Sequence, residues 1–231
     1  LYLLYVSYAG FVIFGYCDGI YLKMIGTKYD NLDFPKLKFF FKILLIYLLF
    51  GVFIFLPITF LLHVEVTKWY IIICSIAGIF LACLNSFFIL INQATQKYNN
   101  YAIGNIIEKL ILVISVIIAI IFHIKNIMFI VFASLFGKLL TLLYYLIKNR
   151  EIILSKSNKG TSLEVFDNVK IGFFLTISSI FSMLMTGLGK FFIEGNYGIE
   201  YLGYYSFVFS MFSPFTQLTD SVALILIPKL K

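Results

Sequence analysis

The chain has 231 residues, of which 61% are hydrophobic and only 13% are charged. This composition excludes an ordinary soluble globular domain, because about a quarter of the residues of such a domain are charged. The formal net charge of +7 does not indicate a nucleic-acid partner, since the basic residues lie between apolar segments and not on one soluble face. We therefore expect an integral membrane protein.

Seven apolar segments are long enough to cross a bilayer as helices, because a hydrocarbon core of about 30 Å needs roughly 20 helical residues. Apolar runs such as 110–122 lack the alternation of apolar and polar residues that membrane β-strands require. The sequence therefore predicts an all-α, multi-pass membrane protein. The predicted membrane helices cover residues 1–22, 40–62, 69–92, 103–122, 127–147, 171–193 and 201–227.

The connections between these helices alternate in their content of basic residues. Thirteen lysines and arginines lie in or beside the first, third and fifth connections or in the C-terminal tail, whereas the other three connections contain only Lys68 and Lys125. Cytoplasmic connections of membrane proteins carry such an excess of positive charge. This pattern places the first group in the cytoplasm, so the first helix runs inward and we expect another helix before it.

Residues 148–170 form the longest segment outside the predicted membrane helices, and the middle of this segment is rich in Ser, Asn and Gly. We expect a first bundle at 1–147, of which the sequence shows five helices and a preceding first helix is missing. A cytoplasmic linker follows at 148–170, and the first two helices of a second bundle follow at 171–231. An offset of 202 residues aligns Asp18 with Asp220. Either chance or the internal repeat of a transporter explains this alignment.

Charged and polar side chains inside membrane helices mark candidate functional positions, because they are costly there. Lys138 is the charged residue closest to the middle of its predicted helix, and polar residues follow one face of several helices at steps of three or four. One such stripe is typical of hydrogen bonds between membrane helices, whereas several together favour a shared polar cavity. The candidate substrate-binding residues are Lys138, Ser134, Thr141, Asn85, Asn92, Ser210 and Gln217.

Three acidic residues, Asp18, Glu108 and Asp220, lie in the cytoplasmic third of their predicted helices. They are candidates for binding a coupling cation. For Asp18 and Asp220 the simpler explanation is pairing with Lys23 and Lys229, or capping of neighbouring helices.

No arrangement of residues indicates catalysis or a metal centre. His63 and His123 lie at the edges of outer connections, without a cysteine or carboxylate at ligand spacing. Cys17, Cys74 and Cys83 lie inside apolar segments, which is typical of buried free thiols. We therefore expect neither enzyme activity nor a cofactor.

Three segments carry a resemblance to a known family. They are GYCDGIYLKMIGTKYDNLD at 15–33, NQATQKYNNYAIGNIIEK at 92–109, and the stretch 169–207 that begins VKIGFFLTISS. They resemble bacterial O-antigen and capsule oligosaccharide flippases of the Wzx type, in the superfamily that also contains multidrug exporters and lipid II flippases. The resemblance covers nearly the whole chain and implies a transporter of about twelve or more helices in two pseudo-symmetric bundles. Relative to that family, we expect the first helix and most of the second bundle to be missing from this sequence.

The resemblance also implies a function. Such a protein moves undecaprenyl-pyrophosphate-linked oligosaccharide across the bacterial inner membrane, driven by an ion gradient. The expected partners are the lipid-linked oligosaccharide, membrane lipid and other polysaccharide assembly proteins. Lys138 would then contact the pyrophosphate, unless it pairs with a carboxylate from a helix outside this chain.

Other functions stay open at this point. Drug extrusion is the alternative within the superfamily, although the excess of basic over acidic charge near the midplane disfavours cationic drugs. A polysaccharide polymerase or glycosyltransferase would also be multi-pass, but it usually needs a large outer loop, and the outer connections here are short. A structural scaffold would not need Lys138.

Overall fold

The computed structural model describes residues 13, 15–61, 69–124, 126–156 and 160–230, and every secondary-structure element within them is helical. This confirms the predicted all-α class. The elements are α3 (Tyr16–Met24), the 3₁₀ helix η1 (Tyr29–Asn31), α4 (Phe34–Leu61), α5 (Trp69–Ala94), α6 (Tyr98–Ile121), α7 (Ile127–Lys148), α8 (Arg150–Leu154), α9 (Ser162–Tyr197) and α10 (Ile199–Leu230). Among the segments whose side chains the structure describes without interruption, three are long and apolar enough to cross a membrane: Ile72–Ala94, Tyr98–Ile121 and Met128–Lys148.

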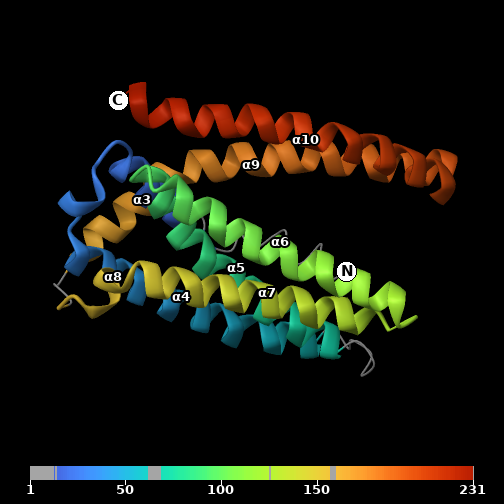
Figure 1. The fold of residues 1–231 in the computed structure, drawn as a ribbon, viewed down its shortest axis with the longest axis horizontal. Helices are drawn as coiled ribbons and strands as arrows, with labels where there is room; N and C mark the ends of the chain where they lie inside the picture. Colours follow the sequence, from blue (N-terminus) through green and yellow to red (C-terminus); the bar gives the residue numbers. More distant parts are fainter. Residues whose placement is uncertain (1–12, 14, 62–68, 125, 157–159, 231) are drawn as a thin grey trace.

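The connections between the long helices gather at two opposite ends of the molecule (Figure 1). One end holds η1, the turn at 95–97 and α8. We call it the basic end, because the connections rich in lysine lie there. The turn between α6 and α7 and the turn between α9 and α10 lie at the opposite end. This is the alternation expected of a chain that crosses a membrane repeatedly.

Several helices extend beyond the predicted membrane segments. α4 begins at Phe34 instead of residue 40, and Asp33 caps it, because its Oδ1 accepts a hydrogen bond from the backbone N–H of Lys36 at 3.0 Å. α9 begins at Ser162, inside the predicted linker, which also contains α8. Hydropathy identifies only the part of a helix that lies in the hydrocarbon. A helix can extend farther into the polar interface, because backbone hydrogen bonds and caps determine where it ends.

A single residue separates α9 from α10. Gly198 has a φ of 87°, an angle that residues other than glycine rarely adopt. Its backbone N–H donates to the carbonyl of Glu194 at 3.1 Å. The predicted helices leave residues 194–200 between them as a connection, but Asn196 lies in α9 and Glu200 lies in α10. The two helices therefore form a tight hairpin, which runs along the upper edge of Figure 1.

Glycines bring α3 and α9 into backbone contact near the basic end. A Cβ atom on Gly19 would overlap the carbonyl of Asn168, and a Cβ atom on Gly172 would overlap the carbonyl of Gly15. Gly15 and Gly19 are four residues apart, a spacing that lets membrane helices approach closely. The helix after the predicted linker therefore packs directly against a segment from the start of the chain.

The apolar core is built mainly from α3, α4 and α5, with smaller contributions from α7 and α8. Its fully buried side chains include Leu37, Phe88, Tyr145 and Ile152. By contrast, α6 exposes a row of large aliphatic side chains: Ile103, Ile106, Leu110, Val113, Ile114, Ile117, Ile120 and Ile121. Such a surface is suited to contact with lipid tails and not with water.

Candidate functional site

α6 and α7 form an antiparallel hairpin with close backbone contact. A Cβ atom on Gly104 would overlap the ring and hydroxyl of Tyr145. The hydroxyl of Thr141 donates to the carbonyl of Gly104 at 3.3 Å, and the hydroxyl of Tyr145 donates to the carbonyl of Tyr101 at 3.4 Å. Small and hydroxyl-bearing residues are the usual means of joining helices inside a membrane. These contacts fix the register of the hairpin.

An ion pair lies in the middle of this hairpin. The Nζ of Lys138 on α7 is 2.7 Å from Oε1 of Glu108 on α6, and the two side chains are 13% and 20% exposed. A third helix joins them, because the side-chain amide of Asn85 on α5 donates to the backbone carbonyl of Lys138 at 3.0 Å. The structure thus brings three polar residues from three helices to one place.

The two charges lie at the same depth. Glu108 is ten residues from the start of α6 at Tyr98, and Lys138 is ten residues from the end of α7 at Lys148. At 1.5 Å per residue, each lies about 15 Å from the basic end of its helix. The predicted helix had begun at residue 103, which made Glu108 look closer to the membrane surface than its partner.

Pairing explains why both charges can be kept inside the hairpin. A single charge at a helix centre costs about 2.5–3.5 kcal/mol on insertion scales, and a partner of opposite sign offsets part of that cost. The carboxylate that pairs with Lys138 is therefore supplied by this chain itself, and no helix from outside the chain is needed for that role.

The sequence contains a signal for this pair. Glu108 and Lys138 lie fifteen positions on either side of His123, which is in the α6–α7 turn, and Tyr101 and Tyr145 are placed symmetrically about the same residue. In an antiparallel hairpin, residues equidistant from the turn lie at about the same depth. The short connection at 122–126 was therefore enough to place Glu108 and Lys138 at one depth, whereas the contact between their side chains depends on how the two helices are rotated.

The other candidate residues lie in different surroundings. Ser134 and Thr141 are buried on α7, one turn to either side of Lys138. Asn92 is fully buried toward the basic end of α5, and its amide donates to the carbonyl of Phe88 in the same helix. Ser210 is exposed on α10, which packs on α9, and its hydroxyl donates to the carbonyl of Phe207. Thus Asn85, Ser134 and Thr141 accompany Lys138, whereas Asn92 and Ser210 do not join it.

The remaining predicted positions can be placed only in part. Asp18 is half-buried in the first turn of α3. The side chains of Gln217 and Asp220 lie outside the described residues, and the comparison of Asp18 with Asp220 lies outside them too. In the part of the chain that the structure describes, no group of three His, Cys, Asp or Glu side chains is placed to hold a metal ion.

Two buried amides near the basic end are not indicated by the sequence pattern. Asn149 at the α7–α8 junction and Asn168 on α9 are fully buried, although both fall in the predicted linker. The Oδ1 of Asn149 and both amide atoms of Asn168 have no hydrogen-bond partner among the described residues. Buried amides of this kind are unusual in proteins. They are hidden from a reading of the sequence because Asn in a polar connection normally faces water.

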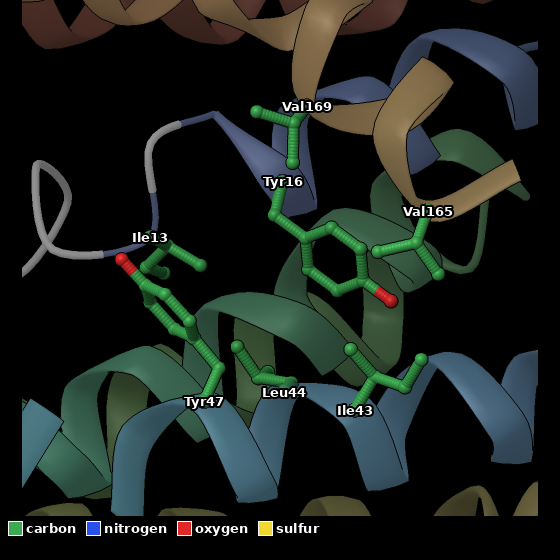
Figure 2. Close-up of a pocket in the computed structure, with 7 residues that line it drawn as sticks. All are labelled: Ile13, Tyr16, Ile43, Leu44, Tyr47, Val165 and Val169. Carbon is green, nitrogen blue, oxygen red and sulfur yellow. The ribbon is translucent and has the colours of Figure 1, made fainter. Parts of the chain in front are cut away.

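An ion pair and an apolar cavity also lie near the basic end. Lys36 on α4 and Glu164 on α9 are 2.7 Å apart, and the hydrogen bond from Lys36 lowers the pKa of the Glu164 carboxyl. Beside them a cavity of about 210 Å³ lies between α3, α4 and α9 (Figure 2). The ring of Tyr16 lies across this cavity, and its hydroxyl donates to the carbonyl of Phe40 at 3.1 Å. The cavity is apolar, because the other lining residues are aliphatic except for Tyr47: Ile13, Ile43, Leu44, Val165 and Val169.

These features define a multi-pass helical membrane protein with a paired charge inside its helices. The comparison with known families agrees with this class: residues 37–228 match the family described as "Polysaccharide biosynthesis protein". The match covers more than three quarters of the chain, and the chain belongs to this family. No curated protein and no solved structure matches the chain.

Proposed function

We propose that this protein is a flippase that moves an undecaprenyl-pyrophosphate-linked oligosaccharide from the cytoplasmic to the outer leaflet of a bacterial inner membrane. Membership of the polysaccharide biosynthesis family carries the proposal. The fold supports it, because the chain consists of long apolar helices and holds charged and polar side chains between three of them. Transport of a lipid with a charged, sugar-bearing head group requires such polar positions at membrane depth.

The polar cluster on α5, α6 and α7 is the proposed contact for the head group. Lys138 is held by Glu108 in this structure, and the phosphate oxygens of a substrate would compete with the carboxylate for its ammonium group. The buried Oδ1 of Asn85 accepts no hydrogen bond from the described residues and would accept one from a sugar hydroxyl. Ser134 and Thr141 flank Lys138 on the same helix.

Glu108 would have a second role in this proposal. When a phosphate engages Lys138, the carboxylate of Glu108 loses its partner and becomes free to pair with a cation. This would couple movement of the substrate to an ion gradient. Asp18 and Asp220 are further candidates for the same coupling, and Asn92, Ser210 and Gln217 would line a path outside the cluster.

Deletion of the gene in its host tests the proposed function. We expect loss of surface polysaccharide together with accumulation of lipid-linked oligosaccharide on the cytoplasmic side of the membrane, both restored by a plasmid copy. Normal surface polysaccharide in the deletion strain would show the proposal to be wrong. If that strain also became sensitive to toxic compounds, drug export would replace flipping as the better explanation.

A further inference from the structure

A second cavity, of about 200 Å³, lies between α4 and α8 at the basic end. One wall is a stripe of α4 that contains Lys38, Phe41, Lys42 and Leu45, at the three- and four-residue steps of a single helix face. The other wall is formed by Ile152 and Ile153 of α8. The cavity therefore combines two lysines with four apolar side chains. We call it the α4–α8 pocket.

The charge pattern of α4 places this pocket at a membrane surface. Residues 43–61, which follow Lys42 to the end of the helix, contain no charged side chain. At 1.5 Å per residue these 19 residues extend for about 28 Å, close to the roughly 30 Å of a hydrocarbon core. Lys42 therefore lies where the hydrocarbon begins, and Lys38 lies one turn farther out, at the level of lipid head groups. The excess of basic residues at this end assigns the surface to the cytoplasmic leaflet.

The two lysines are not neutralised by any carboxylate in the described part of the chain. The Nζ of Lys38 donates to the backbone carbonyl of Ser155 at 2.6 Å, and this neutral acceptor holds the side chain without cancelling its charge. Lys42 is exposed and has no ion pair with a described residue. Lys36, two residues before Lys38 on α4, differs from both lysines because Glu164 neutralises it.

Glu151 is the acidic residue of α8, the helix that forms one wall of the pocket. It precedes Ile152 by one position but does not line the cavity. Its negative charge acts on the hydroxyl of Tyr29, whose pKa burial raises to about 12 with a smaller contribution from Glu151. Among the described residues, the lining of the pocket thus carries two positive charges and no carboxylate.

We propose that the α4–α8 pocket binds an anionic phospholipid of the cytoplasmic leaflet. The phosphate would lie between Lys38 and Lys42, and an acyl chain would follow Phe41 and Leu45 into the bilayer. Basic pockets between membrane helices on the cytoplasmic side recognise anionic head groups in this way. A diacyl phospholipid fits better than a lipid-linked oligosaccharide, because the described residues that line the pocket include no hydroxyl, amide or carboxylate side chain to bind sugars. The bound lipid would fasten α8, and the connection that follows it, to the membrane surface.

Lipid binding to the purified protein tests this proposal independently of transport. The probes are phosphatidylglycerol and phosphatidylcholine with identical acyl chains, titrated into detergent micelles and followed by native mass spectrometry and by thermal unfolding. We expect phosphatidylglycerol to bind more tightly and to raise the unfolding temperature more. Lys42→Gln should weaken phosphatidylglycerol binding by about fivefold, since each lysine near an anionic surface contributes about 1 kcal/mol. Lys42→Arg should retain the binding.

Lys28→Gln is the matched control, because Lys28 is exposed at the basic end but lies outside the pocket. It should leave the preference for phosphatidylglycerol unchanged. Equal binding of the two phospholipids, or equal losses in Lys42→Gln and Lys28→Gln, would overturn the proposal. It would also be overturned if undecaprenyl phosphate bound in a Lys42-dependent manner while phosphatidylglycerol did not, because the pocket would then belong to the transported lipid.

Discussion

Lys138 on α7 and Glu108 on α6 face each other at the same membrane depth, with Nζ and Oε1 2.7 Å apart. This pairing gives Lys138 two possible roles that a single substitution cannot separate. Removal of the lysine would abolish a contact to substrate, but it would also leave a carboxylate without its partner inside the hairpin. Variants that change both residues are needed.

Single and paired substitutions of Lys138 and Glu108 should differ in stability. Lys138→Ala alone should lower the free energy of unfolding in micelles by roughly 2–3 kcal/mol, somewhat less than the 3–5 kcal/mol typical of buried pairs, because both side chains are partly exposed. The double variant Lys138→Ala with Glu108→Ala should lose less than the sum of the single losses. Additive losses, measured by chemical unfolding, would contradict an energetic coupling between the two residues.

Exchange of the two charges separates the structural role from the substrate role. The variant with Lys138→Glu and Glu108→Lys keeps an ion pair at the same depth, so its abundance in the membrane should recover relative to either single change. If Lys138 contacts the substrate, surface polysaccharide should stay low in this variant, whereas Lys138→Arg should keep most of it. Full export by the exchanged variant would reduce Lys138 to a structural residue.

The contact between α3 and α9 should not tolerate a methyl group. In Gly172→Ala the new Cβ would overlap the backbone carbonyl of Gly15, which cannot move aside as a side chain could. We expect a loss of roughly 1–3 kcal/mol in the free energy of unfolding, the usual cost of overpacking. Gly203→Ala on α10 is the matched control, because no described atom lies within 4 Å of its Cβ position. It should be neutral or gain up to about 1 kcal/mol of helix propensity, and equal losses in the two variants would contradict this account of the contact.

The helices could be predicted because runs of about 20 apolar residues have few other structures open to them in a membrane. The positions where the helices begin and end could not be predicted in this way. α4 and α9 continue past the apolar runs into Phe34 and Ser162, where backbone hydrogen bonding, and at α4 the cap by Asp33, decide the boundary. The crossing of α3 and α9 was also missed, since a pair of glycines four residues apart does not specify which helix it contacts.

The candidate site was predictable in its residues and not in its contacts. Lys138 stood out because a charge at the centre of an apolar helix is rare. The apolar segment begins at residue 103, which places its partner Glu108 closer to the membrane surface than Lys138. The helix itself begins at Tyr98, which places Glu108 deeper. Symmetry about the turn at His123 corrects that error. By contrast, the burial of Asn149 and Asn168 depends on packing between distant segments, which no local pattern records.

The ion pair between Lys36 and Glu164 should make the contact between α4 and α9 sensitive to acid. The pairing lowers the pKa of Glu164 below its ordinary value of 4.5. The contribution to stability is therefore complete above about pH 4.5 and is lost as the pH falls through the lowered pKa. Glu164→Gln should be less stable than the wild type at pH 6, and the difference should disappear at the acidic end of the titration. Lys36→Gln should give the same loss, and 0.5 M salt should reduce both losses. A difference that persisted unchanged at low pH would contradict this role of the pair.

The two ends of the molecule should lie on opposite sides of the membrane. Single cysteines replacing Lys28, Lys97 or Lys156 at the basic end should resist a membrane-impermeant thiol reagent in intact cells, because basic connections remain in the cytoplasm. A cysteine at Asn196, which is exposed near the α9–α10 turn, should react, as should cysteines replacing Lys68 and Lys125.

The cysteine-free background for this experiment needs alanine at Cys17, Cys74 and Cys83. Since all three thiols are buried, the folding of this background must first be checked by size-exclusion chromatography. All positions should react after the cells are opened, which controls for accessibility. Labelling at position 156 in intact cells would reverse the orientation, and with it the leaflet in which the α4–α8 pocket is placed.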